Sequence, residues 1–166
     1  MIIWKKRQFT EDIDFAMIHV PVPIPSRGHF KVTIIPDEIA NRHSGISYAD
    51  ELRDAIGIVA RRHPRELAVD WLNDEAAGYL YEDAPEPEVE FWQSFGEVLF
   101  VYLPTPAYVF ATKLMASRPK DSGDIQELAK LLDIKNRAQA KALVDRFITP
   151  DAQEFYEIED NLDLFS

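Results

Sequence analysis

Cysteine is absent from this sequence, and glycine is scarce, with six residues among 166. The absence of cysteine excludes a disulfide framework, thiolate metal sites and cysteine nucleophiles, and it favours a reducing, intracellular setting. No Walker-type loop, no dinucleotide-binding glycine motif and no Gly-x-Ser-x-Gly nucleophile elbow occurs. The sequence therefore gives no support to a P-loop, dinucleotide-binding or serine-hydrolase function.

Long apolar runs are also missing. No stretch approaches the ~18 consecutive apolar residues that a transmembrane helix needs. The first residues, MIIWKKRQFTEDID, lack the apolar run and the cleavage site of a signal peptide. We therefore expect a soluble, cytoplasmic protein with no membrane partner.

Basic residues are in the minority, with 18 Lys and Arg against 29 Asp and Glu, and the net charge is −11. This excludes a uniformly basic surface for nucleic acid. The acidic excess is local, because residues 81–91 and 150–166 together hold eleven acidic residues and no Lys or Arg. The remaining chain is electrically balanced, so a locally basic site for phosphate is compatible with the overall charge. Two candidate sites are described below, and the bases that flank them in the sequence are Lys5, Lys6, Arg7, Lys113, Arg118 and Lys120.

Hydrophobic periodicity predicts an α+β protein with a mixed α/β part over residues 1–103 and an all-helical part over 104–166. The strands are expected at residues 11–20, 29–35 and 97–103, the last one buried, and the helices of the first part at 48–62 and 67–80. Residues 82–90 are expected to form a loop. In the second part, the predicted helix caps are Thr105, Asn136 and Thr149, and a last, strongly acidic helix is expected to begin at Thr149-Pro150. The aromatic residues expected in the core, and not on a base-stacking platform, are Trp71, Phe91, Trp92, Phe95, Phe100, Tyr102, Tyr108 and Phe110.

An Asp-Ile-Asp segment is the first candidate site. Asp12 and Asp14 lie in the strand predicted over 11–20, where residues two apart point to the same side. Both carboxylates can then converge on a hard cation such as Mg²⁺, which could bridge the phosphates of a nucleotide. Two solvated acidic residues on an edge strand would have the same spacing. On spacing alone, that second interpretation is favoured.

Lys113 and the residues after it form the second candidate site. Arg118 follows Lys113 by five residues, so on a helix the two share a flank only loosely. A Lys and an Arg would neutralise phosphate charge, the Arg through bidentate contacts. Asp121 and Asp124 stand at the predicted start of the next helix, where capping and the helix dipole favour acidic residues. Capping explains at least one of the two, and from the residues alone it is the favoured explanation.

Three segments, in order and at similar spacing, resemble a family of nucleotidyltransferase-like proteins. Residues 7–14 (RQFTEDID) resemble its R-x-T-x-D-[IVL]-D segment, and residues 70–74 (DWLND) resemble its D-W-L-N-D segment. Residues 104–125 (PTPAYVFATKLMASRPKDSGDI) resemble its P-x-Y-L-L-A-x-K-L-x-A-x-R-x-x-D-x-x-D-I block, the most specific of the three. The family includes uncharacterised bacterial proteins and the AbiEii-type toxins of toxin–antitoxin systems. The resemblance covers the chain from Arg7 to about Phe147.

The resemblance implies a nucleotidyltransferase-like mixed sheet flanked by helices and followed by a C-terminal helical bundle. The metal ligands that it implies for Mg²⁺ are Asp12 and Asp14. The catalytic residues that it implies are Asp12, Asp14, Lys113 and Asp124. The groups that it implies around the nucleotide are Arg7, Lys113, Arg118 and Asp121. The acidic residue of the later block is Asp124, and Asp121 is the less favoured alternative for that role.

The implied reaction is transfer of a nucleotide from a nucleoside triphosphate (NTP) to an RNA or protein acceptor. A hydroxyl of the acceptor would attack the α-phosphate, and pyrophosphate would leave. Positioning and charge neutralisation would supply most of the catalysis. A toxin-like enzyme of this kind would have a cognate antitoxin as a partner.

One departure from the family pattern precedes Asp12. The family normally places a strand and a Gly-Gly or Gly-Ser turn before its aspartate pair, and residues 1–11 contain neither Gly nor Ser. Either the start of the protein has been lost or mis-assigned, or this member is shortened. A shortened member would be a degenerate, non-catalytic relative that acts as a binding or regulatory module. Loss of the first strand would also leave a sheet edge open for a homo-oligomer, as in a purely structural protein.

Overall fold

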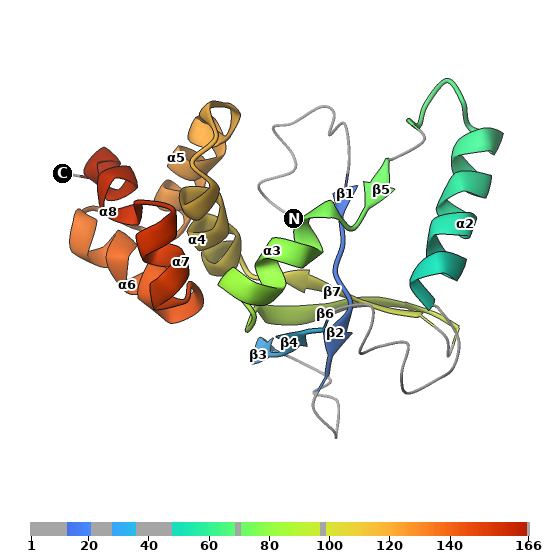
Figure 1. Cartoon of the computed structure of the whole chain (residues 1–166), viewed down its shortest axis with the longest axis horizontal. Coiled ribbons are helices and arrows are strands. Elements are labelled where there is room, and N and C mark those ends of the chain that lie inside the picture. Colours follow the sequence, from blue (N-terminus) through green and yellow to red (C-terminus); the bar gives the residue numbers. More distant parts are fainter. Residues whose placement is uncertain (1–12, 21–27, 36–47, 69–70, 97–98, 166) are drawn as a thin grey trace. The chain divides into compact units, whose positions relative to one another are not determined.

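The computed structural model describes residues 13–20, 28–35, 48–68, 71–96 and 99–165, except for the side chains at positions 13, 14 and 48–50. Figure 1 shows the chain with its helices and strands labelled. Two compact units make up the chain. The first consists of residues 1–19 with 34–81, and the second of residues 20–33 with 82–166.

The first unit contains a short parallel ladder. Strand β1 (Ile13–Asp14) pairs with β5 (Leu72–Asn73), so that Ile13 lies opposite Leu72 and Asp14 opposite Asn73. The Phe15 N–H extends the ladder by donating to the Asn73 carbonyl at 2.8 Å. Strand β2 (Ile18–His19) pairs with β4 (Thr33–Ile34). The strand predicted over 11–20 is therefore two short strands within its described part.

Two helices belong with this ladder. Helix α2 (Tyr48–Arg62) has the bounds that the sequence predicts, and its Ile56 and Ala60, four residues apart, are buried. Helix α3 (Glu75–Asp83) begins directly after β5 and extends beyond the helix predicted over 67–80. Its first N–H, that of Glu75, donates to the side-chain oxygen of Asn73 at 3.1 Å.

An antiparallel sheet of order β3-β6-β7 belongs to the second unit. Strand β3 (Phe30–Lys31) pairs with β6 (Glu88–Phe95), and β6 forms a hairpin with β7 (Leu99–Pro104). Edge-to-face contacts of Tyr102 with Phe30 and Phe91 join the three strands. The pairing of β6 with β7 is irregular between Phe91 and Gln93.

The hairpin corrects two expectations from the sequence. Residues 82–90 are not a loop throughout, because α3 continues to Asp83 and β6 begins at Glu88. The strand predicted over 97–103 is not buried along its described length, since Leu99 and Phe100 are exposed. Among the described residues, β3 pairs with β6 at Glu88 and Val89, and the rest of the hairpin has no third strand beside it. The aromatic side chains that are exposed there instead of lying in the core are Phe91, Trp92, Phe95 and Phe100.

Helices follow the sheet to the end of the chain. These are α4 (Pro106–Ala116), the 3₁₀ helix η2 (Pro119–Asp121), α5 (Ser122–Leu131), α6 (Arg137–Phe147), α7 (Pro150–Phe155), α8 (Ile158–Asn161) and the 3₁₀ helix η3 (Leu162–Phe165). Side-chain oxygens accept the predicted capping bonds, and the three capping residues are Thr105, Asn136 and Thr149. The single acidic helix expected from Thr149 onward is wrong, because Glu157 has a left-handed backbone (φ 50°) and separates α7 from α8.

The helices pack together around α4, which contacts α5, α6 and α8 (Figure 1). The largest side chains buried there are Phe110, Leu114, Met115, Leu128, Val144, Ile158 and Leu162. An α+β chain with a helical C-terminal part is therefore confirmed. The predicted division at residues 103 and 104 stays a prediction, since contacts within one chain do not test independent folding. Among the described residues, no helix is both long enough and apolar enough to cross a membrane.

Candidate functional site

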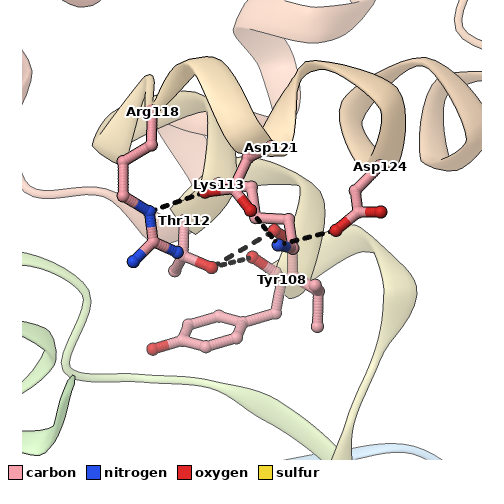
Figure 2. Close-up of polar contacts among 7 residues, drawn as sticks. Tyr108, Thr112, Lys113, Arg118, Asp121 and Asp124 are labelled. Atoms are coloured by element: carbon pink, nitrogen blue, oxygen red, sulfur yellow. Dashed lines mark hydrogen bonds and ion pairs between the residues drawn. The ribbon is translucent and has the colours of Figure 1, made fainter. Parts of the chain in front are cut away.

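The structure brings together four side chains of the second candidate site. Lys113 lies in the last turn of α4, and Arg118 precedes η2. Asp121 ends η2 directly before α5, and Asp124 lies in the first turn of α5. Figure 2 shows the Lys113 ammonium between the two carboxylates and the Arg118 guanidinium beside Asp121. We call these four residues the Lys113 cluster.

Asp121 is the centre of the cluster. Its Oδ1 accepts a hydrogen bond from Lys113 Nζ at 2.5 Å, and its Oδ2 accepts one from Arg118 Nε at 2.6 Å. Only 2% of the side chain is exposed, compared with 49% of the Arg118 side chain. Lys113 Nζ also lies 3.0 Å from Asp124 Oδ2. Both cations are thus held by one buried carboxylate.

The turn after α4 explains how Asp121 reaches Lys113. Ser117 ends α4 in a left-handed conformation (φ 44°), and its N–H donates to the Lys113 carbonyl. Pro119 then begins η2, and the Asp121 N–H donates to the Arg118 carbonyl at 2.8 Å. This tight reversal brings Asp121 back beside the last turn of α4.

Helix capping is the wrong explanation for Asp121. The residue stands at the N-cap position of α5, but its backbone is right-handed helical and its side chain makes no capping bond. Its oxygens accept from Lys113 and Arg118 instead. Asp124 lies in the first turn of α5, where a negative charge is stabilised by the helix dipole as well as by Lys113.

The surroundings of Asp121 keep it ionised. Burial alone would raise the pKa of its carboxyl group, because a charge is less stable away from water. The hydrogen bonds from Lys113 and Arg118, together with their positive charges, outweigh burial and lower the pKa below its ordinary value of 3.8. At neutral pH Asp121 is therefore a carboxylate that faces both Lys113 and Arg118.

This arrangement can present cations to a ligand in fixed positions. An ammonium group has three N–H bonds, and Asp121 and Asp124 take two of those of Lys113. The Lys113 side chain is 22% exposed. The half-exposed guanidinium of Arg118 donates its Nε–H to Asp121. Nothing in this geometry gives Asp121 itself access to a ligand, so its contribution is to hold Lys113 and Arg118.

The first candidate site lies mostly outside the described residues. Arg7 and Asp12 are both outside them. The backbone of Asp14 belongs to β1, in register with Asn73, and its side chain is outside the description. The aspartate pair belongs to the first compact unit and the Lys113 cluster to the second.

A Mg²⁺ site therefore stays a prediction. Within the described ranges, no group of three or more His, Cys, Asp or Glu side chains is placed to hold a metal ion. The carboxylates of the Lys113 cluster, Asp121 and Asp124, face the Lys113 ammonium. The metal ligands that the resemblance implies are Asp12 and Asp14, and both of their side chains lie outside the described part of the structure.

A further polar group was not singled out from the sequence as a site. Asp74, the last residue of the DWLND segment, forms an ion pair with Arg53 of α2. Asn73 lies in register with Asp14. The resemblance identified the segment that contains Asn73 and Asp74, but no local signal pointed to Arg53, which lies 21 residues away in the sequence.

Comparison with protein-family models, with curated proteins and with solved structures finds no match in any of the three. The family assignment therefore stays a prediction from sequence segments.

Proposed function

We propose that this chain is a nucleotidyltransferase-like protein that transfers a nucleotide from an NTP to an RNA or protein acceptor in the presence of Mg²⁺. The observation that carries the proposal is the Lys113 cluster. The residues that the resemblance selected from a 12-residue stretch, residues 113–124, converge around one buried carboxylate. Helix periodicity alone gave no reason to expect that convergence.

The cluster supports a specific assignment of roles. Lys113 and Arg118 would contact the phosphates of the NTP, and Asp121 would hold both cations in place. Asp124 would orient the Lys113 ammonium from its other side. Fixed cations neutralise the charge that develops on a phosphate and on leaving pyrophosphate without rearranging during the reaction.

The remaining roles rest on the resemblance alone. Asp12 and Asp14 would bind Mg²⁺, and Arg7 would contact the nucleotide. Bound Mg²⁺ would polarise the phosphate oxygens and help to align the acceptor hydroxyl with the α-phosphate. A toxin-like activity in the cytoplasm, a cognate antitoxin and a homo-oligomer formed through an open sheet edge are parts of the same proposal.

The alternative is a degenerate, non-catalytic relative that acts as a binding or regulatory module. One observation favours it, namely the charge balance of the cluster. Lys113 and Arg118 are both paired with carboxylates, so the cluster as a whole adds no net positive charge for a triphosphate.

Calorimetry with each of the four NTPs and Mg²⁺ tests the binding step. We expect the full chain to bind at least one NTP, and Lys113→Gln to weaken binding by about tenfold or more, because a charge-assisted contact with phosphate is lost. Lys120→Gln is the matched control, since Lys120 is an exposed lysine of the same segment. Thermal unfolding of each variant shows whether the fold persists.

If Lys113→Gln fails to fold, the variants Lys113→Arg and Asp124→Asn test the same contact with the NTP. Lys113→Arg keeps the charge and should retain measurable binding, whereas Asp124→Asn should weaken it. Absence of binding of every NTP by the unaltered chain, or equal affinities of the Lys113 and Lys120 variants, contradicts the proposal. NTP binding without transfer of labelled nucleotide from any α-labelled NTP to cellular RNA or protein decides for the non-catalytic alternative.

A further inference from the structure

Exposed apolar side chains gather on the hairpin of β6 and β7. They are those of Phe91, Trp92, Phe95, Leu99 and Phe100, and each of these residues has between 42% and 53% of its surface exposed. Between Phe91 and the end of β7 the sequence has one charged residue, at position 97. Large apolar side chains that are exposed together on one element indicate an interaction surface.

The pairing of the two strands places these side chains on both faces of the hairpin. Residues opposite each other share a face, and neighbours within a strand point to opposite faces. Phe91 lies opposite Tyr102, and Phe100 stands two residues before Tyr102, so Phe91 and Phe100 share a face. Phe95 lies opposite Leu99 and is therefore on the other face. A two-stranded ribbon is marginally stable in water, and a further strand with apolar side chains would stabilise it.

Strand β7 has an open edge at which such a strand can pair. It pairs with β6 on one side, and within the described residues no strand lies on its other side. Proteins usually protect an edge strand with a charged side chain, a proline or a bulge. Residues 99–103 of β7 contain no charge and no proline, and the extra residue of the irregular pairing, Trp92, belongs to β6. The backbone groups on the open side of β7 can therefore form a ladder with another strand.

The charges at the base of the hairpin favour an uncharged partner. Glu86 forms an ion pair with Lys31, and Glu88 forms one with Arg146 of α6. A basic partner would have to break these pairs, whereas an uncharged strand would not. A second copy of β7 is an uncharged strand. Glu86 and Glu88 of that copy are paired in the same way, which reduces the repulsion of like charges between the two copies.

We propose that β7 pairs antiparallel with β7 of a second copy of this chain, so that two hairpins join into one sheet. The inference rests on the homo-oligomer of the proposed function, to which it gives an interface, and not on NTP binding. A two-fold axis closes the contact, because each open edge is used once. An aromatic side chain has about 200 Å² of surface, so four half-exposed rings provide about 400 Å² in each copy. Together with Leu99 and the β7 backbone, two copies can bury about 1,000 Å², the lower limit for a specific interface.

Light scattering of the full chain over a wide range of concentrations tests the association. We expect the mass to rise from that of one chain to twice that value and no further. Phe100→Lys should weaken the dimer by about tenfold or more, because the introduced charges of the two copies would lie close to each other. Phe155→Lys is the matched control, since Phe155 of α7 is 78% exposed and lies outside the hairpin. Thermal unfolding of both variants shows whether the fold persists.

Single cysteines locate the two-fold axis, since the chain has no cysteine of its own. Opposed residues of antiparallel strands have Cα atoms about 5 Å apart, within the reach of a disulfide, and only the residue at the axis lies opposite its own copy. Under mild oxidation, a disulfide-linked dimer should therefore form best at one position of β7 and less on either side. The variants are Leu99→Cys, Phe100→Cys, Val101→Cys, Tyr102→Cys and Leu103→Cys, with Phe155→Cys as the control. This series also decides the question if Phe100→Lys does not fold.

The outcomes separate this inference from NTP binding. A mass of one chain at every concentration, or equal dimer affinities of Phe100→Lys and Phe155→Lys, overturns the inference. Masses above that of the dimer mean open-ended association and overturn it as well, and so does a dimer in which no β7 cysteine is linked faster than Phe155→Cys. A monomeric chain that binds an NTP leaves the nucleotide site of the proposed function standing, whereas a β7-linked dimer that binds no NTP leaves this inference standing.

Discussion

Burial of the Asp121 carboxylate is unfavourable in free energy, yet the same carboxylate holds both cations of the Lys113 cluster. A carboxylate that is 98% removed from water loses its hydration, and only partners of opposite charge compensate for that loss. Lys113 and Arg118 provide one hydrogen bond to each oxygen. Removal of any one member therefore leaves a charge or a polar group without the partner for which it was buried.

We predict that Asp121→Asn lowers the free energy of unfolding by about 2 kcal/mol. The amide keeps the shape of the carboxylate but loses the charge that holds Lys113 and Arg118. The loss is smaller than for a fully buried pair, because Lys113 retains Asp124 and Arg118 is half exposed. Urea denaturation monitored by circular dichroism measures the difference.

Asp133→Asn is the matched control for this variant. Asp133 pairs with Lys135 at 3.0 Å, but both side chains are mostly exposed. Its backbone is left-handed (φ 56°), a conformation that Asn adopts as readily as Asp. The control should leave the denaturation midpoint unchanged. Equal midpoints for Asp121→Asn and Asp133→Asn would mean that the buried ion pairs do not stabilise the fold.

The lowered pKa of Asp121 predicts a pH dependence with a definite sign. Because the pKa is lower in the folded chain than its ordinary value of 3.8, the folded chain binds fewer protons at this group than the unfolded chain. The contribution of Asp121 is therefore fully present above pH 3.8 and is lost as the pH falls below it, through the folded-state pKa. The stability difference between the unaltered chain and Asp121→Asn should stay constant from pH 7 to about 5 and shrink toward pH 3. A constant difference across that lower range in urea denaturation contradicts the assignment.

At the scale of elements, the last residue of α3 and the residue that follows it are attached to the helices of the second unit by three hydrogen bonds. The Tyr108 hydroxyl of α4 donates to the Ala84 carbonyl at 2.7 Å. The Thr149 N–H donates to the Asp83 carbonyl at 2.8 Å, and the Tyr156 hydroxyl donates to the Asp83 carboxylate at 2.9 Å. Tyr108 and Ala84 are both buried, so the first of these bonds is shielded from water.

We predict that Tyr108→Phe destabilises the chain by about 1.5 kcal/mol, because the buried Ala84 carbonyl loses its donor while the aromatic packing remains. The ring of Tyr108 packs edge-to-face on Phe147, and phenylalanine preserves that contact. Tyr81→Phe serves as the control, since Tyr81 lies on α3 and is exposed. Thermal unfolding of both variants checks the prediction, and an unchanged midpoint for Tyr108→Phe would contradict it.

The sequence predicted helices better than strands, for a physical reason. Helix boundaries are local, so the caps at Thr105, Asn136 and Thr149 could be identified from a few neighbouring residues. Strands depend on distant partners, and β6 was missed at Glu88 because its acidic, proline-containing start resembles a loop. The break at Glu157 was missed as well, since a non-glycine residue in a left-handed conformation carries no sequence signal.

The candidate site was predictable in composition but not in geometry. The resemblance selected the four residues of the Lys113 cluster, yet residue chemistry alone favoured helix capping for at least one of the two aspartates. The difference lies in the turn at Ser117 and Pro119, which folds Asp121 back over Lys113. Arg53 could not be connected to Asp74 from sequence at all, because their contact depends on how α2 packs against β5.

Across the whole molecule, buried apolar side chains are unevenly distributed among the described residues. The fully buried large ones lie on the helices from α4 onward. Helix α2 buries Ile56 and Ala60 but exposes Ile58 and Val59. Local stability follows the number of buried apolar contacts and the protection of backbone hydrogen bonds from water.

We therefore predict that the two compact units differ in hydrogen exchange. Amide hydrogens of α4 and α6 should exchange slowest, because opening these helices exposes the core around Phe110, Leu114 and Val144 to water. Amide hydrogens of α2 should exchange faster, since this 15-residue helix has two buried apolar side chains at its described positions and can open without disrupting that core. Exchange measured by mass spectrometry on peptides from each helix checks the order. Equal protection of α2 and α4 would contradict this order and mean that the chain opens as one cooperative body. In that case, addition of the NTP identified by calorimetry should slow hydrogen exchange in both helices together.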